Sequence, residues 1–163
     1  MLSQTSEYAL RAAVSLAGEP GQARTAAELA TATHVPAGYL AKVLQSLARA
    51  GVVRSQRGLG GGFVLARPPA EISAYEVLNA VDPIRRIESC PLKLAAHRHA
   101  LCPLHRRLDD AYALIEESFR STSLAELATD PKRRDMAPAW PPAARRGRRR
   151  TASSDPSSPR RSS

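Results

Sequence analysis

The stretch that decides the fold is residues 25–66, TAAELATATHVPAGYLAKVLQSLARAGVVRSQRGLGGGFVLA. It begins with Thr25 and, three residues later, Glu28, which is the spacing of a capping box that opens a short helix. After a brief turn, Pro36 suits the first turn of a further helix, in which apolar residues recur at helical spacing. Gly51 stands where the end of that helix needs a left-handed residue. The segment therefore predicts two helices joined by a tight turn.

A β-hairpin is predicted directly after these helices. Residues 52–56 and 63–66 are short strand candidates, and residues 57–62, RGLGGG, form a glycine-rich turn between them. The turn lacks the Gly-Lys-Ser/Thr ending of a phosphate-binding loop and does not lead from a strand into a helix. The order of helices and hairpin is that of a winged helix-turn-helix, whose last helix enters the major groove of DNA.

Helices are also predicted on both sides of this segment. Apolar residues recur at helical spacing in residues 2–17, and a capping-box pattern at residues 73–76 opens a helix that reaches about residue 80. Residues 103–119 form a long helix with an apolar stripe, and residues 123–126 repeat the capping pattern. We therefore predict a mainly α fold with a small β-hairpin wing, a winged helix-turn-helix followed by a long helix.

The DNA-contacting residues are predicted from the polar face of the last helix and from the hairpin. Small residues near the start of the helix permit close approach, and its first half comes nearest to the base edges. The hairpin offers arginines beside glycines, which suits phosphate or minor-groove contact, although basic residues on a hairpin also serve solubility. The predicted contacts are Gly38, Tyr39, Lys42, Gln45, Ser46, Arg49, Arg54, Arg57, Gly60 and Gly61.

Charge is unevenly distributed along the 163 residues. The formal net charge is +9, from 24 Lys and Arg against 15 Asp and Glu. Residues 131–163 hold ten of the basic and two of the acidic residues, so most of the basicity lies in this tail, where Pro, Ser and Arg dominate. We predict that the tail is disordered and attracts phosphate without sequence preference, or is merely solvated. Residues 1–67 are mildly basic, as expected of a module that faces DNA.

The chain resembles the Rrf2 family of bacterial transcription regulators. The resemblance rests on SEYALRA at residues 6–12, TAAELA at residues 25–30, the long segment HVPAGYLAKVLQSLARAGVVRSQRGLGGGFVLARPPAEISAYEVLNAVD at residues 34–82, and CPLHRRLDDA at residues 102–111. It covers about residues 2–130. The resemblance implies a homodimer in which the long helix of each subunit packs across the other. It also implies a palindromic operator in double-stranded DNA, usually bound by a repressor.

The resemblance also suggests a division of the chain into four parts. Residues 1–81 would form the winged helix-turn-helix domain, and residues 82–102 a cysteine-containing sensor loop. Residues 103–130 would supply the dimerisation helix and a short end helix, and residues 131–163 the disordered basic tail. The N-terminus has the pattern of an amphipathic helix rather than a signal peptide, and no apolar run approaches the ~18 residues of a membrane span. We therefore expect a soluble cytoplasmic protein with no membrane contact.

Members of this family that bind an iron–sulfur cluster carry three cysteines before the long helix, with five residues between one cysteine and the next. Cys90 and Cys102 match the first and third positions, and His105 matches a histidine that follows the last cysteine in one branch. The middle position is Ala96, which cannot bind a metal. The resemblance thus implies either an altered cluster site or a lost one.

Further ligands are implied by the same resemblance. Some members complete the cluster with an acidic residue of the partner's first helix, which corresponds to Glu7. His97 is next to the missing cysteine, and His34 lies where some relatives use a histidine ligand. The two cysteines could instead act as a redox thiol pair, or be small buried residues with no cofactor at all. The histidines could equally be part of a solvated basic patch.

Other classes of function are weighed against a regulator. No Ser-His-Asp order, paired carboxylates in a pocket context or complete zinc motif supports an enzyme. A thiol-based or cofactor-free regulator, and an adaptor that keeps the fold without binding DNA, remain alternatives. The sequence favours a DNA-binding regulator, and the resemblance adds redox, iron–sulfur or nitric oxide status as signals that it could sense.

Overall fold

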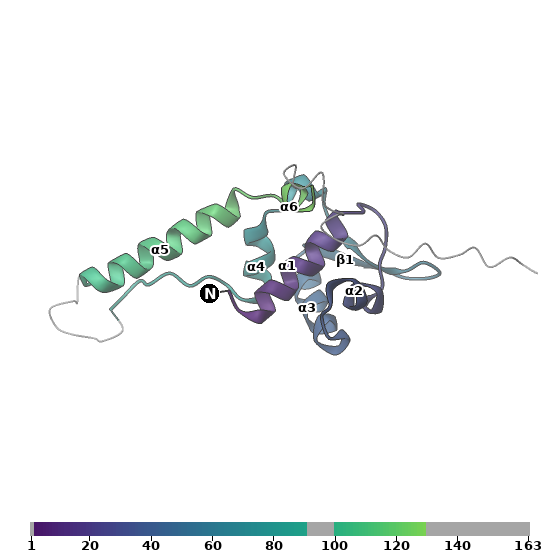
Figure 1. The fold of residues 1–163 in the computed structure, drawn as a ribbon, viewed down its shortest axis with the longest axis horizontal. Helices are drawn as coiled ribbons and strands as arrows, with labels where there is room; N and C mark the ends of the chain where they lie inside the picture. Colours follow the sequence, from purple (N-terminus) through teal and green to yellow (C-terminus); the bar gives the residue numbers. More distant parts are fainter. Residues whose placement is uncertain (1, 91–99, 130–163) are drawn as a thin grey trace, which may run out of the picture.

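The computed structural model describes residues 2–90 and 100–129. Figure 1 shows a group of short helices with a hairpin, from which one long helix extends to one side. The elements, in chain order, are α1 (Gln4–Ala17), α2 (Ala26–Thr33), α3 (Ala37–Arg49), β1 (Val53–Gln56), β2 (Gly62–Leu65), the 3-10 turn η1 (Pro69–Glu71), α4 (Ala74–Val81), α5 (Pro103–Arg120) and α6 (Leu124–Ala128). The predicted fold class and element order are confirmed.

The helix starts follow the local chemistry of the sequence. At α2, the Thr25 side chain accepts from the Glu28 backbone N–H, and the Glu28 carboxylate accepts from the Thr25 N–H, so both bonds of the capping box form. Ser73 and Glu76 do the same at α4. Each box satisfies backbone donors that a helix start would leave unpaired. Pro36 stands one residue outside α3, as its N-cap, rather than within the first turn.

The core is built from small and aliphatic side chains. α1 buries a run of alanines and Leu16, and it packs on α2, α3, α4 and α6. α3 contributes Leu40, Leu44 and Leu47, each with no exposed surface. These side chains occupy one face of α3 at helical spacing, so the packing leaves the opposite face to solvent.

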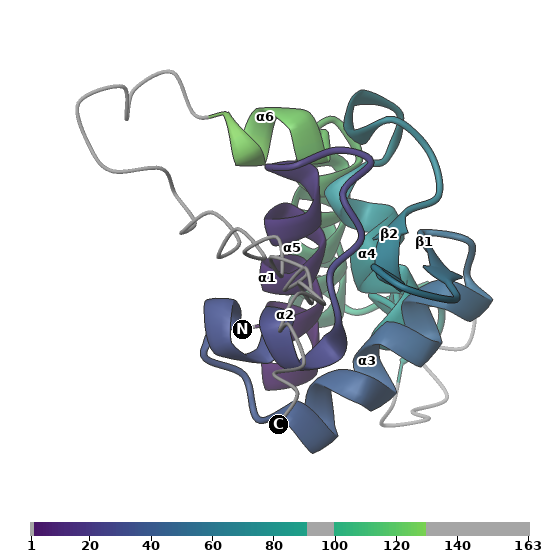
Figure 2. The same cartoon turned by 90° about the vertical axis from the view of Figure 1, so that its right-hand side faces the viewer.

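The hairpin is antiparallel, with Val53 opposite Leu65 and Gln56 opposite Gly62. Its turn is closed by the Gly61 N–H, which donates to the Gly58 carbonyl at 2.9 Å. The hairpin lies beside α3, as Figure 2 shows. Gly51, with φ of 72°, makes the left-handed step between α3 and β1, as predicted.

One basic residue of the N-terminal half is a core residue. Arg24 is 3% exposed, and its Nη1 donates to the Ser15 hydroxyl at 2.6 Å. Its backbone pairs with Phe63, which anchors β2 to the segment between α1 and α2. Arg24 counts toward the net positive charge of residues 1–67, but its charge lies inside the fold and not on the surface.

α5 is unlike the other helices because none of its 18 residues is buried. Its apolar stripe is exposed, including Leu104, Leu108, Tyr112 and Ile115, and Leu114 beside it is 73% exposed. The segment 82–90 runs next to the helix (Figure 1). Within residues 2–90 and 100–129, no helix has both the length and the apolar composition that crossing a bilayer requires.

Candidate nucleic-acid interface and metal centre

The exposed face of α3 carries most of the predicted base contacts. Lys42, Gln45 and Arg49 are exposed, and Ser46 is half-buried. They share this face because the buried leucines and Val43 occupy the other. A Cβ placed on Gly38 would meet no heavy atom within 4 Å, so the start of the helix is unobstructed. This face is sterically open to a groove of DNA.

Tyr39 is placed differently from its neighbours on α3. Its hydroxyl hydrogen-bonds the Thr5 hydroxyl, and its ring meets the Tyr8 ring edge-on, with centroids 5.5 Å apart. The side chain is 39% exposed. Tyr39 therefore joins the start of α3 to α1, and a base contact by this residue stays a prediction that would use its remaining exposed surface.

The wing presents Arg54 and Arg57 to solvent. Gly60 has φ of 82°, as the third residue of a type II turn requires. Leu59 occupies the second position of that turn and is fully exposed. The sequence analysis did not single out Leu59, although a large apolar residue between glycines in a turn has no core to fill.

The positive charges of this face are not neutralised by any carboxylate that the structure describes. Among residues 2–90 and 100–129, no carboxylate forms an ion pair with Lys42, Arg49, Arg54 or Arg57. By contrast, Arg67 pairs with Glu76 in the cap of α4. Unpaired, exposed cations on one surface attract a polyanion.

Cys90, Cys102 and His105 form a second site at the start of α5. The Nδ1 atom of His105 lies 3.1 Å from the Cys102 sulfur and 3.7 Å from the Cys90 sulfur. All three donor atoms lie within 4.8 Å of one another. Cys90 is 6% exposed, and the other two are half-buried. The structure thus brings together the two cysteines and the histidine that the sequence analysis named as ligands.

The donor set fits one metal ion. Zinc–sulfur bonds of about 2.3 Å and zinc–nitrogen bonds of about 2.0 Å in a tetrahedron place sulfur and nitrogen about 3.6 Å apart. The observed separations, 3.1 and 3.7 Å, bracket this value. An iron–sulfur cluster usually requires four protein ligands, which are distributed over its iron atoms. The described residues bring only three together, all close enough to share one centre.

Of the other predicted ligands, Glu7 and the alternate His34 are not part of this group. Glu7 forms an ion pair with Arg11 one turn along α1. His34 caps the end of α2 with φ of 54°, a left-handed conformation. His97 and the missing-cysteine position, Ala96, lie outside the described residues, as does the basic tail. A ligand from the partner's Glu7 would require a dimer, so the role of that residue stays a prediction.

Segment 82–90, which carries Cys90, is tied to α5 by Asp109. Arg86 donates from Nε and Nη2 to the two Asp109 oxygens, at 2.7 and 2.6 Å. The Ile87 N–H donates to the same carboxylate at 2.9 Å. The hydrogen bonds from Arg86 and Ile87 lower the pKa of Asp109 to about 2. These bonds hold the segment beside the first half of α5.

A pH titration should detect this link. Because the folded pKa of Asp109 is lowered from 3.8 to about 2, its contribution to folding is present above pH 4 and is lost as the pH falls toward 2. Carboxyl NMR should show the low pKa in the wild type and a return toward the ordinary value in Arg86→Ala. Arg85→Ala, the matched neighbour, should leave it low. A wild-type pKa near 4 would contradict the bidentate contact.

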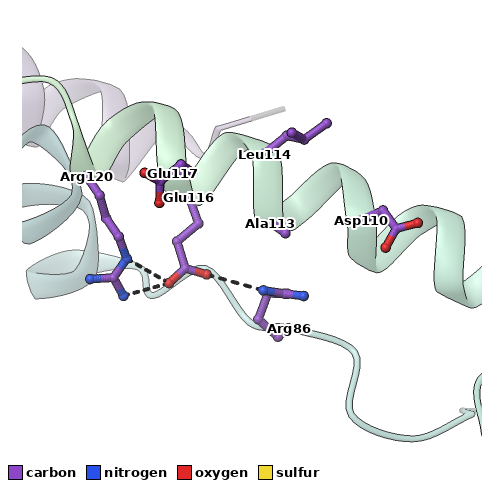
Figure 3. Close-up of a pocket in the computed structure, with 7 residues that line it drawn as sticks. All are labelled: Arg86, Asp110, Ala113, Leu114, Glu116, Glu117 and Arg120. Carbon is purple, nitrogen blue, oxygen red and sulfur yellow. Dashed lines mark hydrogen bonds and ion pairs between the residues drawn. The ribbon is translucent and has the colours of Figure 1, made fainter.

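Glu116 connects the same segment to the end of α5. It accepts from Arg120 at 2.6 Å and lies 3.9 Å from Arg86, at an open hollow of about 560 Å³ (Figure 3). The hydrogen bond from Arg120 lowers the pKa of Glu116. Arg120 also stacks on the Tyr75 ring of α4, 3.8 Å from its centroid. The charged side chains that line the hollow therefore connect α4, segment 82–90 and α5 through ion pairs and the contact with Tyr75.

Known proteins resemble the chain along most of its length. Residues 2–130 match the profile of the Rrf2 family, described as iron-dependent transcriptional regulators. A Mycobacterium tuberculosis protein named as an HTH-type transcriptional regulator is 35% identical to the chain over 132 residues. The match covers 78% of this chain and 80% of the relative. One of Aquifex aeolicus is 29% identical over 130 residues, covering 78% and 90%.

Solved structures agree in fold. The global cysteine regulator CymR of B. subtilis superposes with a TM-score of 0.67 at 25% identity, covering 80% of this chain and 97% of CymR. IscR of T. potens gives a TM-score of 0.68, covering 84% and 92%, and at 23% identity the likeness concerns the fold alone. The matched proteins are transcriptional regulators rather than enzymes.

Proposed function

Because the chain belongs to the Rrf2 family of DNA-binding transcriptional regulators, we propose that it binds a palindromic operator as a homodimer and represses transcription. The observation that supports this proposal best is the open polar face of α3 beside a basic hairpin, both with cations that no described carboxylate neutralises. The DNA reader, in this proposal, is residues 1–81. Residues 82–102 are the sensor segment, and residues 103–130 provide dimerisation.

In the proposed complex, α3 enters the major groove. Lys42 and Gln45 are one turn apart on the exposed face, where an ammonium can donate to guanine acceptors and an amide can pair with adenine. Gly38 and Tyr39 bring the helix start close to the bases. Arg49 lies at the far end of α3, where it can neutralise a phosphate and fix the helix in register.

The wing contacts the adjacent minor groove or its phosphates. Arg54 and Arg57 supply charge, and the turn at Gly60 and Gly61 keeps bulk low. The exposed Leu59 side chain at its tip would lie against sugars or the groove wall, because minor-groove proteins use apolar residues in this way. The wing would thus extend each half-site beyond the bases that α3 reads.

The homodimer is proposed from the surface of α5. Five of the eight exposed large hydrophobic residues in the described part of the chain lie on this helix. A groove lined by Leu2, Ile84, Tyr112 and Ile115 opens beside it, between the start of α1 and segment 82–90. A symmetric partner helix would cover both the stripe and the groove, as closed two-fold dimers do. Two recognition helices would then lie about one DNA turn apart.

Regulation is proposed to act through Cys90, Cys102 and His105. Cys90 lies in segment 82–90, which follows α4, and Cys102 is the N-cap residue of α5, so the site bridges the DNA-reading and dimerising parts. A change at this site would alter how α5 is held against segment 82–90, and with it the spacing of the two recognition helices. The iron–sulfur cluster of the family would need a donor beyond these three.

Replacing Lys42 by Ala tests the DNA-reading face. Operator affinity should fall by about tenfold or more, since a base-edge contact contributes about 1–3 kcal/mol and is lost in both subunits. Affinity for unrelated DNA should change much less. Arg106→Ala, which removes one positive charge from the far side of α5, is the control and should bind normally. Equal weakening on operator and unrelated DNA in gel shifts would show that Lys42 contacts phosphate rather than bases.

A further inference from the structure

We propose that Cys90, Cys102 and His105 bind a single divalent metal ion of borderline softness, such as Zn²⁺ or Fe²⁺, in a tetrahedral site for which the described residues supply three of the four ligands. The inference depends on the proposed function only for its regulatory consequence, since metal binding can be measured without DNA. It departs from the polynuclear cluster that the family resemblance implied.

The three donor atoms lie close enough together to share one metal ion. His105 Nδ1 faces both sulfurs, at 3.1 and 3.7 Å, and no two of the three atoms are more than 4.8 Å apart. Ligands of one tetrahedral ion stand about 3.6–3.8 Å from each other. Bridging sulfides push the irons of a cluster apart, so ligands on different irons are necessarily more widely spaced. Three donors that converge on one point therefore suit one ion.

The chemistry of the donors selects the ion. Two thiolates and an imidazole favour zinc, iron or copper over magnesium or calcium, which prefer oxygen. Binding forms two metal–sulfur bonds and one metal–nitrogen bond, releases one proton from each thiol to solvent, and transfers no electrons. Cys102 is also the N-cap of α5, where the helix dipole favours a negatively charged ligand. Tetrahedral coordination by sulfur and nitrogen ligands is typical of zinc.

The ion would fasten two elements together. Cys90 lies beyond Arg86 and Ile87, which already bond to Asp109 of α5. A metal ion bound by Cys90, Cys102 and His105 would add a second connection between segment 82–90 and the start of α5. It would also close the intervening 11 residues, 91–101, into a loop. Gain or loss of the ion would thereby change how firmly α5 is held to the DNA-reading part of the protein.

Cobalt binding to the reduced, full-length protein tests the proposal. Anaerobic titration with Co²⁺ should saturate at one ion per chain, with the visible absorption of tetrahedral cobalt and a thiolate charge-transfer band. Zn²⁺ should bleach both. His105→Asn and Cys102→Ser should each weaken Co²⁺ binding by at least about 100-fold, since even the loss of an outer-shell partner costs about 10–100-fold. His34→Asn is the matched control and should bind as the wild type does.

Three results would overturn the proposal. One is Co²⁺ affinity that is unchanged in the His105 and Cys102 variants while circular dichroism shows them folded. Another is the absence of stoichiometric metal in the wild type. The third is reconstitution with iron and sulfide that yields two or more irons and matching labile sulfide held by Cys90 and Cys102, which would restore the cluster. None of these results bears on operator binding, so a failure here and a failure of the proposed function are distinguishable.

Discussion

Ile115→Glu is expected to convert the protein from a dimer to a monomer and to lower operator affinity by about 100-fold or more. Ile115 lies in the middle of the exposed stripe of α5 and borders the groove beside it. In a two-fold dimer each substitution occurs twice at one interface. Burying two unpaired carboxylates there costs several kcal/mol of association free energy. This cost exceeds what burial of the rest of the apolar stripe contributes to dimer formation.

Loss of DNA binding follows from loss of the second subunit. A monomer engages one half-site only, so the contacts of the other α3 no longer contribute to the same binding event. Light scattering should give the mass of one chain, and gel shifts should give the drop in affinity. Arg106→Glu places the same carboxylate on the opposite side of α5 and should remain dimeric. An Ile115→Glu protein that stays dimeric and binds its operator would contradict the proposed interface.

Gly62→Ala is expected to have the largest effect on stability, a loss of about 2–4 kcal/mol. A Cβ at this position would lie 2.5 Å from both the carbonyl carbon and oxygen of Arg24, and 2.9 Å from the Thr25 nitrogen. These are backbone atoms, so no side chain can rotate away. The β2 strand would have to separate from Arg24, which breaks the pair of hydrogen bonds between Arg24 and Phe63.

Urea unfolding of the variant measures this cost directly. Gly60→Ala is the matched control, because Gly60 also has a positive φ but a Cβ there would meet no atom within 4 Å. It should cost only the backbone strain of a left-handed residue, about 1–2 kcal/mol. If both variants lose the same stability, the close approach of β2 to Arg24 is not what requires Gly62.

The secondary structure could be predicted because its signals are local. The capping boxes at Thr25 and Ser73, the left-handed Gly51 and the glycine-rich turn each specify a start, an end or a reversal from a few neighbouring residues. The periodic apolar face of α3 then identified which residues of that helix stay exposed. Boundaries differed by only a residue or two where, as at Pro36, the proline precedes the helix instead of opening it.

Features that depend on tertiary contacts could not be predicted in the same way. Nothing local to Arg24 indicates burial, because its partner Ser15 lies on another element. The bond between Tyr39 and Thr5 joins residues 34 positions apart. The alignment of Cys90 and Cys102 with family positions suggested a site, but only the structure shows that His105 Nδ1 lies near both sulfurs. Charge counts alone likewise could not separate cations held by carboxylates from those that remain available to DNA.

Selection of binding sites from random duplex DNA separates sequence recognition by α3 from attraction of phosphate by the tail. The full-length protein is used at salt high enough to suppress attraction by its basic tail. We expect a two-fold symmetric sequence whose half-sites are centred about 10 base pairs apart, or a multiple of that spacing. Its enrichment should be lost when Lys42 and Gln45 are both changed to Ala. Recovery of DNA without any shared sequence, by a protein that is folded and dimeric, would contradict this expectation.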